Sequence, residues 1–184
     1  MTGSPERLRK LSRIMKLMVV LCGALFCSAV VYGHWQIFFD RAGFEQGIRD
    51  VVFPRVSTIT LSYRAIATVV FLTALNNALV IAGLAFAWQL FDGFERGEIL
   101  SSRNGVLLKR IGIIAIVGSL CIVVSNAVGV MAVTYDNPGA TDHSVLIDIN
   151  GGTVIVLLMA GLLLVLGHVM VIASGIEAEN RSFV

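Results

Sequence analysis

Four long apolar runs set the strongest limit on what this chain can fold into. They cover residues 14–32, 65–91, 111–135 and 152–176. Each is near or above the ~20 residues that an α-helix, rising ~1.5 Å per residue, needs to cross ~30 Å of hydrocarbon. Hydrophobic residues make up 57% of the chain and charged residues only 14%, which leaves too little polar surface for a water-soluble globule. We therefore predict an all-α integral membrane protein, a bundle of four spans.

The connection between the first two spans, residues 33–64, is too short and too apolar to form a separate soluble domain. Residues 1–184 are therefore expected to form a single membrane domain. Within this connection, apolar residues recur at helical spacing opposite charged ones: Phe44, Ile48, Val51 and Val52 against Glu45, Arg49 and Asp50. This pattern is typical of a short helix that lies in the membrane interface.

Lysine and arginine counts in the short loops predict the orientation, because these residues are retained on the cytoplasmic side. The segment before and at the start of span one carries Arg7, Arg9, Lys10, Arg13 and Lys16, and the connection between spans two and three carries Arg96, Arg103, Lys109 and Arg110. Residues 136–150 contain neither lysine nor arginine. Both termini are therefore expected in the cytoplasm, with an uncleaved first span.

Polar residues inside the spans are the candidates for an intramembrane site, since unsatisfied polar groups are unfavourable in hydrocarbon. They are Asn76, Asn77, Asn126 and His168. One hypothesis is a small transporter or ligand-binding bundle that uses these side chains near the midplane. The simpler interpretation is hydrogen bonding between helices, which contributes ~0.6 and at most ~2 kcal/mol.

The sequence gives little support for a haem site, a metal site or a catalytic site. A bis-histidine haem needs a second histidine at the depth of His168, and His34 and His143 are both predicted at the external surface. Cys22, Cys27 and Cys121 form no Cys-x-x-Cys pair, and no metal-ligand or catalytic motif is present. We therefore expect no enzymatic activity, no cofactor and no metal. The net charge of +2 is small and gives no reason to expect direct nucleic-acid binding.

The connection between spans two and three has the most distinctive sequence. Trp88, Phe91 and Glu95 recur at helical spacing, which predicts that the second span continues beyond the membrane and ends near Gly97. Ser101 or Ser102 is then suited to cap the third helix. Small residues that would allow close helix packing are Ala82, Gly83, Gly118, Gly161 and Gly167.

This connection and the C-terminal segment resemble the bacterial membrane-protein family called domain of unknown function 2975. The resemblance rests on Leu90 to Ile99, on Arg110-Ile111-Gly112, on Gly161 to Leu164, and on Gly175 followed by Glu177 to Asn180. It implies a four-span protein of the bacterial inner membrane. Members of the family are frequently paired with a small helix-turn-helix regulator, which implies a soluble partner but supplies no enzymatic activity.

The leading functional hypothesis is a non-enzymatic membrane protein whose cytoplasmic face docks or regulates such a partner. The expected docking residues are Phe94, Glu95, Arg96, Glu98, Arg110, Glu177 and Glu179. They belong to the connection between spans two and three and to the C-terminal segment, which the topology places on one side of the membrane. The lipid bilayer is the other expected partner, and self-association into a homo-oligomer is compatible with this scheme.

Overall fold

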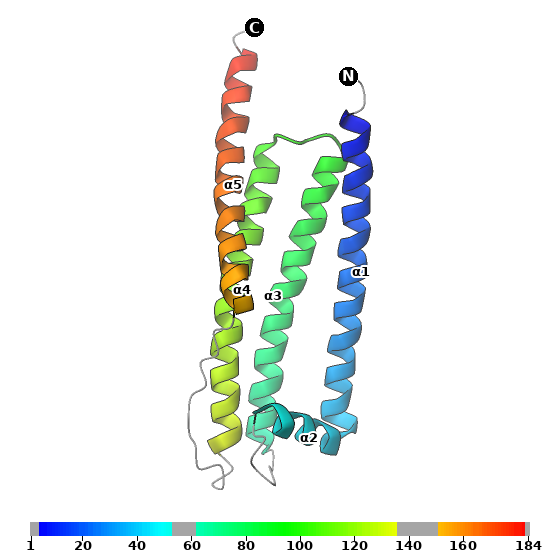
Figure 1. Cartoon of the computed structure of the whole chain (residues 1–184), viewed down its shortest axis with the longest axis vertical. Coiled ribbons are helices and arrows are strands. Elements are labelled where there is room, and N and C mark those ends of the chain that lie inside the picture. The colour runs from blue at the N-terminus through cyan, green and yellow to red at the C-terminus, as the bar shows by residue number, and fades with distance from the viewer. Residues whose placement is uncertain (1–3, 53–61, 136–150, 183–184) are drawn as a thin grey trace. The chain divides into compact units, whose positions relative to one another are not determined.

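The computed structural model describes residues 4–52, 62–135 and 151–182, and these residues form five α-helices with no strand (Figure 1). The helices are α1 (Ser4–Phe39), α2 (Arg41–Val52), α3 (Tyr63–Glu95), α4 (Ser102–Tyr135) and α5 (Gly151–Ser182). The all-α fold and the short helix between the first two spans are confirmed. His143 and the other residues of the 136–150 loop lie outside the described part of the chain.

Four of the helices are long and apolar enough to cross a membrane: α1, α3, α4 and α5. They contain 32 to 36 residues, or about 48–54 Å at ~1.5 Å per residue. This is longer than the apolar runs alone, because each helix continues into polar sequence at one or both ends. The third span shows this most clearly, since α4 begins at Ser102 rather than near residue 111.

The helix starts are fixed by side-chain caps that satisfy free backbone N–H groups. Asp40 Oδ1 accepts the Gly43 N–H at 3.1 Å before α2, and Ser62 Oγ accepts the Ala65 N–H at 3.1 Å before α3. Ser101 Oγ accepts a bond of 3.2 Å at the start of α4. The cap expected at Ser101 or Ser102 is therefore Ser101.

The chain divides into two compact units, which are described separately. Unit 1 comprises Met1–Ala24, Leu79–Ser119 and Asn150–Val184, and unit 2 comprises Leu25–Ala78 and Leu120–Ile149. In unit 2, Phe44 of α2 packs on the buried pair Ala65 and Val133, together with Ile66 and Val69. The interfacial helix is thus held by an apolar contact with α3 and α4.

In unit 1, α4 and α5 pack closely along a seam of small residues. A β-carbon at Gly105 would lie 2.9 Å from the Gly167 carbonyl oxygen, and one at Gly112 would lie 2.8 Å from the Ala160 carbonyl oxygen. Close backbone approach matters here because lipid removes the hydrophobic drive that brings helices together in water. Gly167 was expected at such a contact, whereas nothing lies within 4 Å of a β-carbon at Gly118 or Gly161.

The seam generates a prediction that compares two glycines of α5. Gly167→Ala places a methyl group 2.7 Å from the Gly105 carbonyl oxygen, whereas Gly161→Ala meets nothing within 4 Å. We expect Gly167→Ala to lower the free energy of unfolding by about 1–3 kcal/mol. Gly161→Ala should leave it unchanged or raise it by up to ~1 kcal/mol through helix propensity. Unfolding in mild detergent measures both, and equal effects would contradict close packing at this seam.

Candidate functional site

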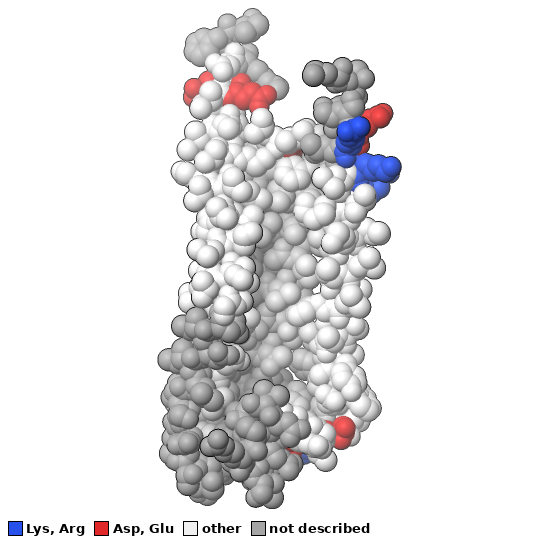
Figure 2. All heavy atoms as spheres, in the orientation of Figure 1, with Lys and Arg blue, Asp and Glu red and all other residues white. Residues whose placement is uncertain are grey.

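Charged side chains gather at one end of unit 1, which we call the charged end. It consists of the first turns of α1 up to Lys16, the α3–α4 turn (residues 92–104) and the last turns of α5 (residues 174–182). Figure 2 shows lysine and arginine over the beginning of α1 and acidic residues over the last part of α5. Acidic and basic side chains also meet at this end, because Asp92 and Glu95 pair with Arg13 and Lys16.

The α3–α4 turn is sharply defined by glycine and by backbone hydrogen bonds. Gly97 has a φ of 86°, a conformation that side chains disfavour. The Gly97 N–H donates to the Phe94 carbonyl and the Glu98 N–H donates to the Gly93 carbonyl, both at 3.1 Å. This pair of bonds is the Schellman arrangement that ends many helices. The predicted end of the second span near Gly97 agrees with this turn.

A fully buried amide holds the turn against the start of α4. Asn104 is 0% exposed, and its Nδ2 donates to the Glu98 carbonyl. Its backbone N–H donates to Ser101 Oγ. A β-carbon at Gly93 would collide with the Asn104 side chain, so glycine at position 93 makes room for this amide. Asn104 therefore joins the turn to the first residues of α4. No pattern in the sequence predicted this role.

Ion pairs connect α1 to the end of α3. Lys16 Nζ lies 2.8 Å from Asp92 Oδ1 and 3.0 Å from Glu95 Oε2, and Arg13 Nε lies 3.2 Å from Glu95 Oε1. Arg96 pairs with Asp92 from the following turn of α3. The Lys16 side chain is only 16% exposed, and its ammonium group also lies 4.7 Å from the centre of the Trp88 ring. Lys16 is thus the centre of a network joining two helices.

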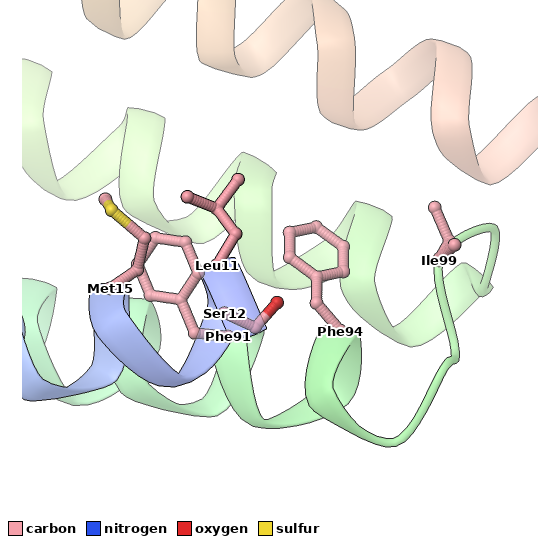
Figure 3. Close-up of a pocket in the computed structure, with 6 residues that line it drawn as sticks. All are labelled: Leu11, Ser12, Met15, Phe91, Phe94 and Ile99. Carbon is pink, nitrogen blue, oxygen red and sulfur yellow. The ribbon is translucent and has the colours of Figure 1, made fainter. Parts of the chain in front are cut away.

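An apolar groove of about 270 Å³ lies beside this network (Figure 3). Leu11, Ser12 and Met15 of α1 line it together with Phe91 and Phe94 of α3 and Ile99 of the turn. The Phe91 and Phe94 rings meet edge to face, with their centres 6.3 Å apart. All lining side chains except Ser12 are apolar, so the groove suits an apolar group.

A second, smaller recess of about 180 Å³ joins the α3–α4 turn to α5. It is lined by Leu100 of the turn and by Ser174, Glu177 and Ala178 of α5. Leu100 lies in the turn, outside both helices, and its apolar side chain is 58% exposed. The recess therefore places an exposed apolar side chain next to an acidic helix end.

The predicted docking residues fall into four structural groups. Phe94 lines the groove, while Glu95 and Arg96 take part in the ion pairs. The guanidinium of Arg110 lies 5.6 Å from the centre of the Phe86 ring, on α3. Exposed side chains at Glu98 and Glu179, together with Glu177 in the recess, form the remaining acidic group. The sequence pattern did not separate these structural roles, and docking at these residues stays a prediction.

The four polar residues of the spans are divided between the two units. Asn76 Nδ2 donates to Ser125 Oγ at 2.9 Å and to the Leu72 carbonyl at 3.0 Å, all within unit 2. Asn77 is half-buried, Asn126 is exposed on α4, and His168 is exposed on α5 of unit 1. The Asn76 bond is the interhelical type that the simpler interpretation expects. A midplane ligand site stays a prediction that rests on the sequence.

Within the described ranges, no group of three or more histidine, cysteine or acidic side chains is arranged to hold a metal ion. All three cysteines are free. The arrangement at the charged end offers ion pairs, an apolar groove and an acidic recess. These are features of binding surfaces.

Four helices that are long and apolar enough to cross a membrane define a multi-pass α-helical membrane protein. The chain belongs to the family described as protein of unknown function (DUF2975), whose model matches residues 45–182. The resemblance drawn from the turn and the C-terminal segment is thereby confirmed. Comparison with curated proteins and with solved structures found no significant match.

The ion-pair network predicts unequal effects of two charge reversals on α1. Lys16→Glu places a third acid beside Asp92 and Glu95, whereas Arg13→Glu affects Glu95 alone from a side chain that is 78% exposed. Lys16→Glu should therefore lower the thermal unfolding midpoint in detergent clearly more than Arg13→Glu. High salt should reduce the effect of Arg13→Glu more than that of Lys16→Glu, because salt screens exposed charges more than partly buried ones. Equal midpoints for the two variants would show that Lys16 does not centre the network.

Proposed function

We propose that the protein is a non-enzymatic adaptor of the bacterial inner membrane that binds a small soluble regulator at its charged end. The observation that carries this proposal is the recess between Leu100 and the last turns of α5. It brings together the two segments that carry the family resemblance. One binding surface formed by both segments would explain why both resemble the family.

The proposed orientation places the charged end in the cytoplasm. Basic residues cluster at the beginnings of α1 and α4, which both lie at this end, whereas residues 136–150 lack lysine and arginine. Retention of positive charge on the cytoplasmic side favours this arrangement. A soluble cytoplasmic protein then has direct access to the recess.

The exposed apolar side chains at this end support a protein partner. Leu100 is 58% exposed in the turn, and Ile176 is 55% exposed near the end of α5. Lipid accounts for exposed leucine along the spans, but Leu100 lies beyond the apolar part of α3 and α4. Exposed apolar residues rimmed by polar ones are typical of interaction surfaces.

The acidic side chains around the recess indicate the chemistry of the partner. Glu177 lines the recess, and Glu98 and Glu179 are exposed nearby along the turn and α5. The Glu98 carboxylate forms no ion pair with any described residue. An acidic surface favours a basic partner, and DNA-binding regulators carry basic surfaces for phosphate contacts. A regulator bound here would use the same basic surface that it needs for DNA.

Affinity purification from the native cell extract in mild detergent tests this proposal. The parent protein should retain one soluble basic protein in stoichiometric amount, and added DNA or high salt should release it. Leu100→Ser should weaken retention about tenfold or more, since burying a leucine contributes ~1.5–3 kcal/mol. Glu98→Ala should weaken it to a smaller extent.

Glu6→Ala provides the matched control, because Glu6 is an exposed acid at the same end but lies on α1, away from the lining of the recess. This variant should retain the partner as well as the parent protein does. The proposal fails if the parent protein retains no soluble protein. It also fails if Leu100→Ser, Glu98→Ala and Glu6→Ala all retain the same amount.

A further inference from the structure

The apolar groove between α1 and α3 is separate from the acidic recess and needs its own explanation. Its walls come from Leu11, Met15, Phe91, Phe94 and Ile99. A dry apolar cavity of ~150 Å³ is large enough to hold benzene, so about 270 Å³ has room for a segment of an acyl chain. Figure 3 shows the side chains of Leu11 and Phe94 at this groove.

Ser12 is the one polar residue that lines the groove, and its hydroxyl lacks a partner. The residue is only 4% exposed, and its Oγ forms no hydrogen bond with any residue that the structure describes. Figure 3 shows the oxygen pointing toward the Phe94 side of the groove. A hydroxyl without a partner in the protein is free to bond to water or to a ligand. It is suited to donate to a polar atom of a ligand that is otherwise apolar.

Two arginines lie one helical turn outward from the groove residues of α1. Arg7 precedes Leu11 by four residues and Arg9 precedes Ser12 by three, spacings at which helical side chains are neighbours. Both arginines are exposed, and neither forms an ion pair with a described residue. The basic residues beyond Ser12, Arg13 and Lys16, are paired with acids of α3. The positive charge without an acidic partner at the start of α1 therefore lies outward from the groove.

The position of the groove along α1 matches the boundary between headgroups and hydrocarbon. The apolar run of α1 begins near residue 14, so Met15 lies just inside it and Ser12 just outside. Phe91 lies at the end of the apolar run of α3. A phospholipid has its phosphate, its ester groups and its acyl chains in this same order across the interface.

We propose that the groove is a binding site for one anionic phospholipid of the leaflet at the charged end. The phosphate lies between Arg7 and Arg9, the Ser12 hydroxyl donates to an ester carbonyl, and an acyl chain occupies the groove against Met15 and Phe91. Charge favours a lipid over the proposed protein partner, because the recess attracts a basic surface whereas the start of α1 attracts an anion. This site is independent of the proposed function and of which side the charged end faces.

Native mass spectrometry of the full chain, released from nanodiscs of equal parts phosphatidylglycerol and phosphatidylcholine, tests the proposal. The parent protein should retain one phosphatidylglycerol molecule in preference to phosphatidylcholine. The double variant Arg7→Gln/Arg9→Gln should lose at least about tenfold in this preference, since each basic residue near a membrane surface contributes about fivefold. Arg64→Gln/Arg103→Gln removes the same charge from exposed positions on α3 and α4 and should leave the preference unchanged.

A second pair of variants tests the groove itself. Ser12→Leu should exclude the acyl chain and abolish preferential retention, while Ser12→Ala should reduce retention about two- to tenfold by removing one hydrogen bond. If Ser12→Leu fails to fold, Ser12→Ala and the arginine variants still decide the outcome. Circular dichroism and gel filtration establish folding for each variant.

Four results would overturn the proposal. Equal retention of both lipids by the parent protein would show that no anionic site exists. Equal loss in the Arg64→Gln/Arg103→Gln control would reduce the effect to overall charge. If soluble glycerol phosphate displaces the lipid as effectively as a whole phospholipid does, the acyl chain does not contribute to binding. If the arginine variants lose a soluble protein but retain the lipid, the arginines bind that protein. Either result would show that the groove is not a phospholipid site.

Discussion

The hydrogen-bonding requirement of the backbone in hydrocarbon determines most of this structure. A lipid bilayer offers no partner for free N–H and C=O groups, so each crossing segment satisfies them within its own helix. The four spanning helices are therefore long and continuous, and all irregular backbone among the described residues lies at their ends. Most of the chemically varied side chains lie at these ends as well. A search for function in such a protein therefore begins at the helix ends.

The lack of a hydrophobic drive between helices explains how the charged end is held together. Close packing at Gly105, Gly112 and Gly167 joins α4 to α5, and the Lys16 ion pairs join α1 to α3. The buried Asn104 and the left-handed Gly97 fix the turn between α3 and α4. Backbone contacts, ion pairs and caps thus replace the apolar core that a soluble protein would use, and they position both the groove and the recess.

Hydropathy and turn residues predicted the helices well because these signals are local. The apolar runs located four spans, glycine at position 97 marked the end of α3, and the serines at positions 101 and 102 marked the start of α4. Helix pairing was harder to predict, since small residues are common throughout membrane helices. Gly161 and Gly167 look alike in sequence, yet only Gly167 meets a neighbouring backbone.

The binding surfaces were only partly predictable for a related reason. From the sequence alone, Lys16 indicates only which side of the membrane the N-terminus occupies. Its partners Asp92 and Glu95 lie 76 and 79 residues away in sequence. In the sequence, nothing distinguishes Leu11 and Met15 from other apolar residues at the edge of a span. In the structure they line the groove together with Phe91 and Phe94. Contacts between distant segments depend on which helices meet, and one sequence does not supply that information.

Whether the charged end faces the cytoplasm is the claim on which the proposed function depends, and site-directed labelling measures it most directly. In a variant with Cys22, Cys27 and Cys121 replaced, single cysteines are introduced as Ser102→Cys and Ser144→Cys, and intact cells receive an impermeant thiol reagent. We predict modification at position 144 in intact cells and at position 102 only after permeabilisation. Modification at position 102 but not 144 in intact cells would reverse the orientation and contradict cytoplasmic docking.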